Sequence, residues 1–242
     1  MTTKQLVTII VLITSFIIIL FLLFRLNLGE TSDKEICHNS VTLKAKTSIF
    51  SGYLDCKINY LCVSGGGNCE GIPETSTADI NGGSDVDKVK DEIMKALADE
   101  IASCWWQFGE GKIDYADRTG GNDVACSVCS ITGFDENLKD TKITYLDFYD
   151  YLQKTSKEKG GSQTYLKYIY DEDNLGFLGT DFPIENYLEN EIDASKTYFI
   201  LTGMSSGVAF SRWGSEHLPV IILEKTQDNH DKVGCDEFLT KP

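Results

Sequence analysis

The chain has 242 residues, of which 37 are acidic and 22 basic, and its formal net charge is −15. A chain of this length can bury one substantial hydrophobic core. So acidic a surface repels phosphate backbones and anionic lipid head groups, which argues against nucleic acid as a partner. No motif in the sequence indicates a cofactor.

The N-terminal segment is strongly apolar. Residues Leu6 to Phe24, LVTIIVLITSFIIILFLLF, carry no charge, and their only polar groups are the hydroxyls of Thr8, Thr14 and Ser15. At about 1.5 Å per residue they cover roughly 28 Å, enough to cross the hydrocarbon core of a bilayer. We therefore predict a single transmembrane helix within residues 1–29, with the lipid bilayer as its partner. The alternatives are a cleaved signal peptide, for which an A-x-A-like site is missing, and a buried core helix.

The cysteines decide the orientation of this span, because the few basic residues at its two ends nearly balance. All eight follow the span, and an even number in an extracytoplasmic domain predicts disulfide bonds. They are Cys37, Cys56, Cys62, Cys69, Cys104, Cys126, Cys129 and Cys235. We predict a cytoplasmic N-terminus and an external domain over residues 30–242, with a net charge near −17 because only Lys4 and Arg25 are charged before it. The pairing of the cysteines stays open.

For residues 30–242 we predict an α+β fold with a largely antiparallel sheet. The segments with strand character are Val41–Phe50, Tyr53–Val63, Val124–Phe134, Tyr198–Thr202 and Val220–Leu223. Other segments are a loop over Ser64–Gly83 held through Cys69, a short helix over Thr144–Lys154, and an ambiguous stretch over Gln163–Tyr170.

The clearest element is a long amphipathic helix over Ser84–Phe108. Ser84 and Asp87 form a capping pair, and Gly109 and Gly111 stop the helix. Its apolar residues recur at helical spacing and predict one buried stripe. They are Val86, Val89, Ile93, Leu97, Ile101, Cys104, Trp105 and Phe108.

The C-x-x-C sequence Cys126-Ser-Val-Cys129 permits two special interpretations. It could be a redox pair in a thiol oxidoreductase or part of a zinc site. Its surroundings look extended, however, and a strand would point the two cysteines to opposite faces, toward different structural partners. We expect Cys104, on the buried stripe, to be bonded into the sheet, with Cys126 and Cys129 the nearest candidates. The histidines His38, His217 and His230 do not repeat at zinc-ligand intervals.

The sequence Gly203-Met204-Ser205-Ser206-Gly207 matches the G-x-S-x-G of α/β-hydrolases, with Ser205 as nucleophile and His217 as candidate base. The nucleophile should open a helix, yet Gly214 follows soon, and Glu216 is the only acid between the two residues. A glycine-rich turn between strands explains the same residues. We therefore assign no catalytic residue, and keep Ser205 and His217, together with the two cysteines of the C-x-x-C, as candidates for an enzyme.

Two acidic stretches invite a calcium interpretation. The sequence from Asp171 to Gly176 begins like an EF-hand loop but has Leu175 at its fifth position and Phe182 at its twelfth. A second group is Asp79, Asn81, Asp85 and Asp87. Turn formation and helix capping account for both groups, so we predict no metal site.

An N-terminal span followed by EICHNSV, a helix ending in CWWQFGEGK and a strand with C-x-x-C resembles membrane-anchored surface proteins encoded by archaea. The resemblance covers most of the chain and implies no particular activity. The start, KQLVTIIVLIT, is similar to an archaeal pilin, whose apolar N-terminal helix bundles into a filament core. It departs from the pilin pattern because it lacks a glycine before the apolar run and an early glutamate within it.

Together these observations predict a membrane-anchored extracellular domain of the cell envelope with a structural or binding role. Its expected partners are copies of itself or another envelope protein. The alternatives are an envelope enzyme, either a serine hydrolase or a thiol oxidoreductase, and a pilin-like filament subunit.

Overall fold

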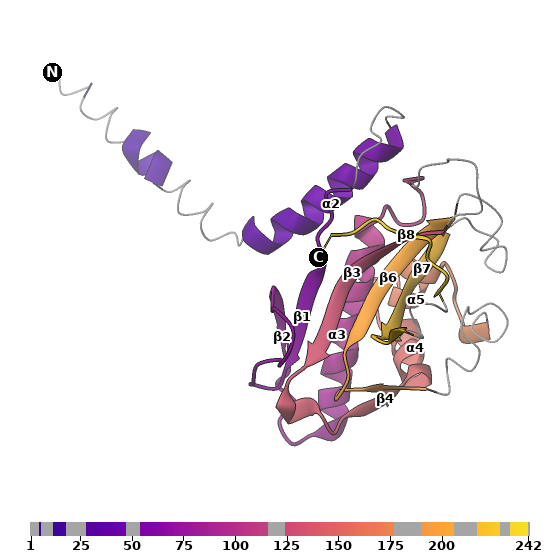
Figure 1. Ribbon diagram of the computed structural model, residues 1–242. Helices are drawn as coiled ribbons and strands as arrows, with labels where there is room; N and C mark the ends of the chain where they lie inside the picture. The colour runs from indigo at the N-terminus through magenta and orange to yellow at the C-terminus, as the bar shows by residue number, and fades with distance from the viewer. Residues whose placement is uncertain are drawn as a thin grey trace.

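The computed structural model describes residues 5, 12–17, 28–46, 54–115, 124–176, 190–205, 217–227 and 233–241 (Figure 1). Most of the predicted span Leu6–Phe24 lies outside this part of the chain. Among the helices that the structure describes, none is both long enough and apolar enough to cross a membrane.

The protein has an α+β fold built on one mixed sheet. Its helices are α2 (Leu28–Lys46), α3 (Val86–Gln107), η1 (Glu136–Leu138), α4 (Tyr145–Lys154) and α5 (Tyr165–Tyr170). The strands are β1 (Asn59–Ser64), β2 (Ser76–Asp79), β3 (Val124–Phe134), β4 (Lys142–Thr144), β5 (Glu191–Asp193), β6 (Tyr198–Ser205), β7 (His217–Glu224) and β8 (Glu237–Phe238).

The order of strands in the main sheet is β2-β1-β3-β6-β7, and β8 pairs with the first part of β3. β1 pairs in parallel with β2 and β3, and β8 pairs in parallel with β3. β6 is antiparallel to both of its neighbours, β3 and β7. The predicted α+β fold is confirmed, and the sheet, predicted to be largely antiparallel, is mixed. The long helix α3 lies between β1 and β3 in sequence, and such a crossover returns the chain in its original direction, so the two strands pair in parallel.

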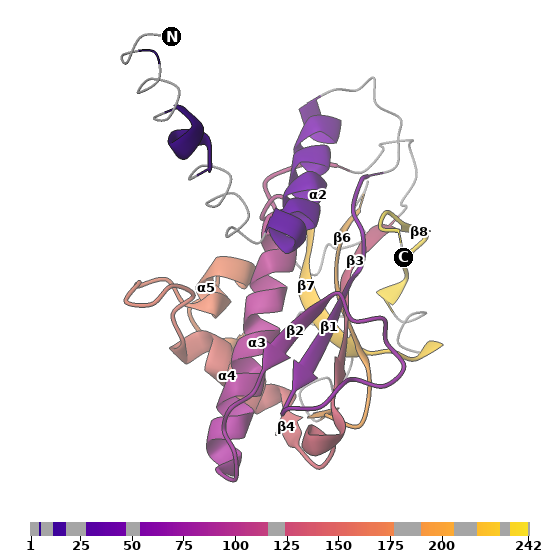
Figure 2. The same ribbon diagram turned by 90° about the vertical axis from the view of Figure 1, so that its left-hand side faces the viewer.

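The sheet separates two unequal layers. Helices α3, α4 and α5 cover one face (Figure 2). The C-terminal segment that contains Cys235 lies on the other, before the chain enters the sheet as β8. All residues of β3 are buried because this central strand is covered on both faces. Helix α3 supplies most of the helical layer, and its predicted stripe from Val89 to Phe108 is buried as expected. Val86 departs from the stripe, with an exposed fraction of 63%.

The capping residue of α3 is one position later than predicted. Asp85, not Ser84, is the N-cap, and its carboxylate accepts a hydrogen bond of 3.2 Å from the backbone N–H of Lys88. Helix α4 starts as predicted, because Thr144 accepts from the backbone N–H of Asp147.

Two segments before α3 differ from the prediction. The predicted strand Val41–Phe50 is wrong as far as Lys46, because those residues belong to helix α2. Cys37 and Val41, four residues apart, are both buried on the inner side of that helix, so tertiary packing outweighed the β-branched residues that suggested a strand. The predicted loop Ser64–Gly83 contains the short edge strand β2.

All eight cysteines form disulfide bonds. The pairs are Cys37–Cys56, Cys62–Cys69, Cys104–Cys129 and Cys126–Cys235. The bond of Cys104 ties α3 to β3, as predicted, and Cys126 is joined to the C-terminal segment on the opposite face of the sheet. Four disulfides are typical of a domain that folds in an extracytoplasmic, oxidising compartment.

The sequence separations of these bonds predict a stability order. The bond Cys126–Cys235 closes a separation of 109 residues and Cys62–Cys69 one of 7. In the chain-entropy account their removal should lower the free energy of unfolding by about 5 and about 2 kcal/mol respectively. Denaturant unfolding of the two double Cys→Ala variants under non-reducing conditions measures the difference. Equal losses, or the reverse order, would contradict it.

Candidate functional site

The structure does not assemble Ser205 and His217 into a hydrolase site. Ser205 is the last residue of β6 and is fully buried. Met204 and His217 are partners across the β6–β7 ladder and share a face of the sheet. Because adjacent residues of a strand point to opposite faces, Ser205 lies on the other face from His217. Ser206 and Gly207 lie outside the described residues.

The C-x-x-C cysteines are likewise separated. Cys126 and Cys129 have exposed fractions of 0% and 2%, and each is bonded to a different partner. A redox pair of the C-x-x-C type requires the two sulfurs to bond to each other and one thiolate to be accessible. The arrangement in β3 is that of two structural cross-links.

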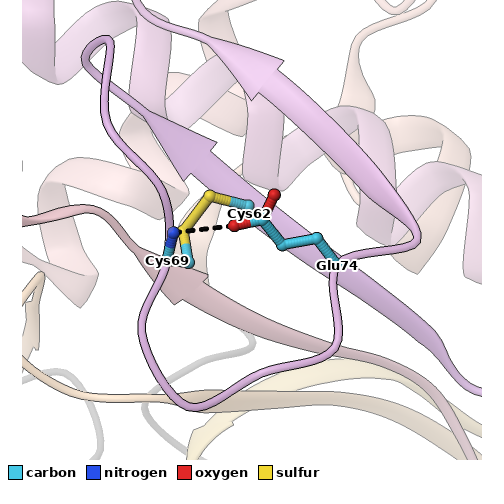
Figure 3. Close-up of side chains that lie close together, drawn as sticks. All are labelled: Cys62, Cys69 and Glu74. Carbon is cyan, nitrogen blue, oxygen red and sulfur yellow. Dashed lines mark hydrogen bonds between the residues drawn. A yellow bond between two sulfur atoms is a disulfide. The ribbon is translucent and has the colours of Figure 1, made fainter.

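One group within the described residues has the spacing of metal ligands, namely Cys62, Cys69 and Glu74. Figure 3 shows that its two sulfurs form a disulfide and that Glu74 accepts a hydrogen bond from the backbone N–H of Cys69, at 2.8 Å. Zinc binds thiolates, which a disulfide does not provide. The group therefore fastens the loop after β1 rather than offering a metal site.

The two acidic stretches are engaged in other ways. The carboxylate of Asp171 lies 3.1 Å from the Lys167 ammonium, and Asp173 lies 3.5 Å from the same group. Asp85 caps α3, and the backbone N–H of Asn81 donates to the carboxylate of Glu92. The cap at Asp85 is of the kind that the sequence suggested, whereas Asp171 and Asp173 form ion pairs with one lysine.

A glycine-rich loop follows β1 at the carboxyl end of the parallel strands, a common place for ligands. Here the loop holds a carboxylate of the protein itself. Asp135, fully buried after β3, accepts hydrogen bonds from the backbone N–H of Gly67 at 2.6 Å, the hydroxyl of Ser64 at 3.2 Å and the backbone N–H of Asn137 at 3.1 Å. An added Cβ at Gly67 would lie 2.9 Å from this carboxylate, so the glycine permits the close approach.

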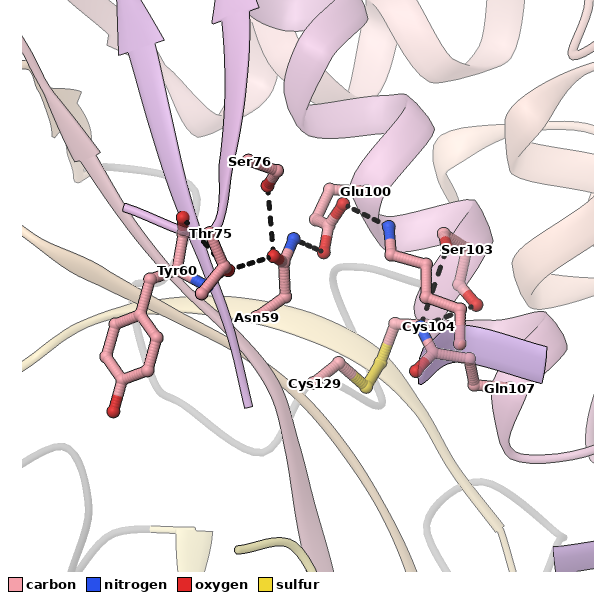
Figure 4. A network of polar contacts seen from close by, with 10 residues as sticks. Asn59, Tyr60, Thr75, Ser76, Glu100, Ser103, Cys104, Gln107 and Cys129 are labelled. Atoms are coloured by element: carbon pink, nitrogen blue, oxygen red, sulfur yellow. Dashed lines mark hydrogen bonds and ion pairs between the residues drawn. A yellow bond between two sulfur atoms is a disulfide. The ribbon is translucent and has the colours of Figure 1, made fainter. Parts of the chain in front are cut away.

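A buried polar network fastens α2 to the body of the domain (Figure 4). The carboxylate of Glu100 on α3 is 6% exposed, lies 2.9 Å from the Lys34 ammonium of α2 and accepts a hydrogen bond of 3.0 Å from the Asn59 side chain of β1. The ring of His38 stacks on that of Trp106, with ring centres 4.3 Å apart. Each charge that is removed from water here has a partner, as stability requires.

A cleft of about 860 Å³ lies on the helical side of the sheet. Its walls come from the end of α3 and the turn after it, from α5 and the turn before it, and from the start of β7. Glu110, Lys157, Tyr168 and His217 are among its lining residues. Its volume is within the range of ligand clefts, roughly 300–1,000 Å³, and most of its lining side chains are polar.

The turn after α3 forms one wall of the cleft. Gly109, Glu110 and Gly111 have φ angles of 80°, 56° and 67°, so three successive residues adopt the left-handed conformation. The ring of Trp105 packs against Gly111, where an added Cβ would lie 2.9 Å from it. Glu110 and Asp171 are the two non-glycine residues with positive φ in the described parts of the chain, and both line this cleft. Such residues are enriched at functional sites.

The Glu110 carboxylate organises this part of the cleft. It lies 2.7 Å from the Lys112 ammonium and accepts a hydrogen bond of 2.8 Å from the Tyr168 hydroxyl. The hydrogen bond to Lys112 is the main cause that lowers the pKa of Glu110, and the Tyr168 hydrogen bond and the nearby Lys157 charge lower it further. Burial and the contact with Glu110 raise the pKa of Tyr168, which therefore stays a neutral donor.

Sequence reasoning missed Glu110, Lys157 and Tyr168. The GEGK sequence was interpreted only as the stop of a helix, and Tyr168 belongs to the stretch left ambiguous. The one available signal was a charged residue between two glycines at a helix end. That signal does not indicate which residues will contact Glu110 in the folded protein.

Comparison of this chain with protein-family models, with curated proteins and with solved structures finds no match.

The contacts of Glu110 predict a pH-dependent contribution to stability. Its pKa in the folded protein is below the ordinary value of 4.5, so the ionised carboxylate stabilises the fold above that pH, and the contribution is lost as the pH falls through the folded pKa. Glu110→Gln should therefore be less stable than the native protein at pH 7, with the gap shrinking toward pH 3. Denaturant midpoints of both proteins measure it. A gap that is constant with pH would exclude this role of the charge.

Proposed function

We propose that the protein is a membrane-anchored extracytoplasmic binding domain. Residues Leu6–Phe24 cross the bilayer with the N-terminus inside, residues 30–242 lie outside, and the cleft beside α5 and β7 holds a small polar ligand.

The external location is carried by the four disulfides. They use every cysteine of the chain and join α2, β1, α3, β3 and the C-terminal segment. Bonds of this number form and persist in oxidising compartments and are rare in a reducing cytosol.

The anchor is supported by composition and by exposure. Nothing in Leu6–Phe24 is charged, and the residues described within it are helical and exposed to solvent. Phe16, for example, is 62% exposed, and Leu12 64%. Side chains of this kind gain from a lipid environment, which would cover them.

Binding is favoured over catalysis by where the reactive groups lie. The candidate nucleophile Ser205 and the C-x-x-C sulfurs are buried, whereas the cleft gathers polar groups that can hold a ligand. The described lining of the cleft includes no serine or cysteine that could act as a nucleophile.

The orientation predicts a protease result. Protease added to intact cells should digest residues 30–242 while a cytoplasmic marker protein survives. A domain that resists until the membrane is broken would show that it faces the cytoplasm. Peptide mapping of the alkylated, non-reduced protein from the same cells should recover the four bonds.

The anchor predicts a fractionation result. Two charges near the centre of the span, in Ile13→Lys with Phe16→Lys, each cost about 2.5–3.5 kcal/mol of insertion free energy, so the variant should be released by alkaline extraction. The matched control is Ile36→Lys with Leu43→Lys, which changes two exposed apolar residues of α2 outside the span. Retention of both variants in the membrane would refute the anchor.

A further inference from the structure

We propose that the cleft binds a small hydroxyl-rich anion, whose single carboxylate or phosphate group is held by the ammonium of Lys157. The inference rests on the binding role proposed above and adds the chemical class of the ligand.

Lys157 differs from the other lysines of the cleft. Lys112 is paired with Glu110 at 2.7 Å, and Lys167 is paired with Asp171 at 3.1 Å. Lys157 makes no ion pair with the described residues. Its ammonium instead lies 3.8 Å from the centre of the Tyr168 ring.

The ring contact holds this cation in place without neutralising it. An aromatic face attracts an ammonium through its quadrupole and supplies no negative charge. Tyr168 is itself held, because its hydroxyl donates to the carboxylate of Glu110. The side chain of Lys157 is partly buried. It is therefore a positioned cation whose N–H groups remain available to a ligand.

The charge balance of the cleft argues for one anionic group. The lining has three lysines and three carboxylates, Glu110, Asp171 and Glu172, although the chain as a whole has a net charge of −15. Lys112 and Lys167 are paired with Glu110 and Asp171, so among the described lining residues Lys157 is the cation left to hold a ligand, and Glu172 is the carboxylate left without an ion pair. A second anionic group on the ligand would meet Glu172 or the paired carboxylates, and like charges in close contact are unfavourable.

The rest of the lining argues for a hydroxyl-rich ligand. The exposed side chains of Gln163 and Asp171 offer a donor and acceptors, and apolar surface is limited mainly to Trp105, Ile169 and Pro219. A lipid chain would remove these exposed groups from water without replacing their hydrogen bonds, which is costly. A sugar acid or a sugar phosphate supplies both the anion and the hydroxyls.

The test uses the full-length protein in detergent micelles and saturation-transfer NMR titrations. The probes are glucuronate, glucose 6-phosphate and glucose, which share a scaffold and differ in the anionic group. At least one anion should bind at least tenfold more tightly than glucose. Lys157→Gln should weaken that anion about tenfold, because a charged hydrogen bond is lost, and should leave glucose unchanged. Binding of glucuronate alone or of glucose 6-phosphate alone identifies the anionic group.

The matched control is Lys154→Gln, which removes the same charge from α4, where Lys154 pairs with Asp150 outside the cleft at 2.6 Å. It should bind like the native protein. Equal weakening by both variants would reduce the effect to net charge and overturn the proposal, as would equal binding of glucose or no binding of either anion. These outcomes would not change the protease and fractionation results. A wrong ligand class can therefore be distinguished from a wrong location of the domain.

Discussion

The bond between Cys104 of α3 and Cys129 of β3 fixes the relation on which the rest of the domain depends. It joins the principal helix to the central strand at a β-bulge, between Val128 and Ser130, where the ladder with β6 shifts its register. The hydrophobic stripe of α3 alone would allow some sliding along the sheet. Because the disulfide bond lies near the C-terminal end of the helix, it fixes the position of the turn at Glu110, which forms one wall of the cleft.

The same helix also carries the polar attachment of α2. Glu100 lies deep between α2, α3 and β1 and would be costly to bury alone, but Lys34 and Asn59 supply a cation and a donor. Hydrophobic contacts remain favourable over a range of orientations, whereas a buried carboxylate keeps its two hydrogen-bonding partners in one orientation only. The stacking of His38 and the contacts of Glu100 together fix one position and orientation of α2 on the domain.

The sequence predicted best where one local pattern agreed with its surroundings. The periodic stripe of α3, the unbroken apolar run of β3 and the Thr144 cap of α4 needed no distant information. The predictions failed where contacts between distant segments determine the structure. The β-branched Val41 was assigned to a strand but lies in α2. The residues of β1 and β3 do not by themselves indicate that the two strands pair in parallel. The cleft was missed for the same reason, because Lys157 and Glu110 are brought together only by the packing of α5 on α3.

The bond Cys37–Cys56 has a mechanical consequence. It joins the middle of α2 directly to the segment before β1, so a pull applied to the N-terminal end of the chain passes through the sulfur bridge to β1. The disulfide bond bypasses the residues between the two cysteines, so the backbone of this segment does not carry the force. β1 passes the force to β2 and β3, the two strands that pair with it in parallel. The hydrogen bonds between these strands are then loaded in shear. Reduction of this one disulfide would lengthen the load-bearing tether by the bypassed residues without cutting the chain.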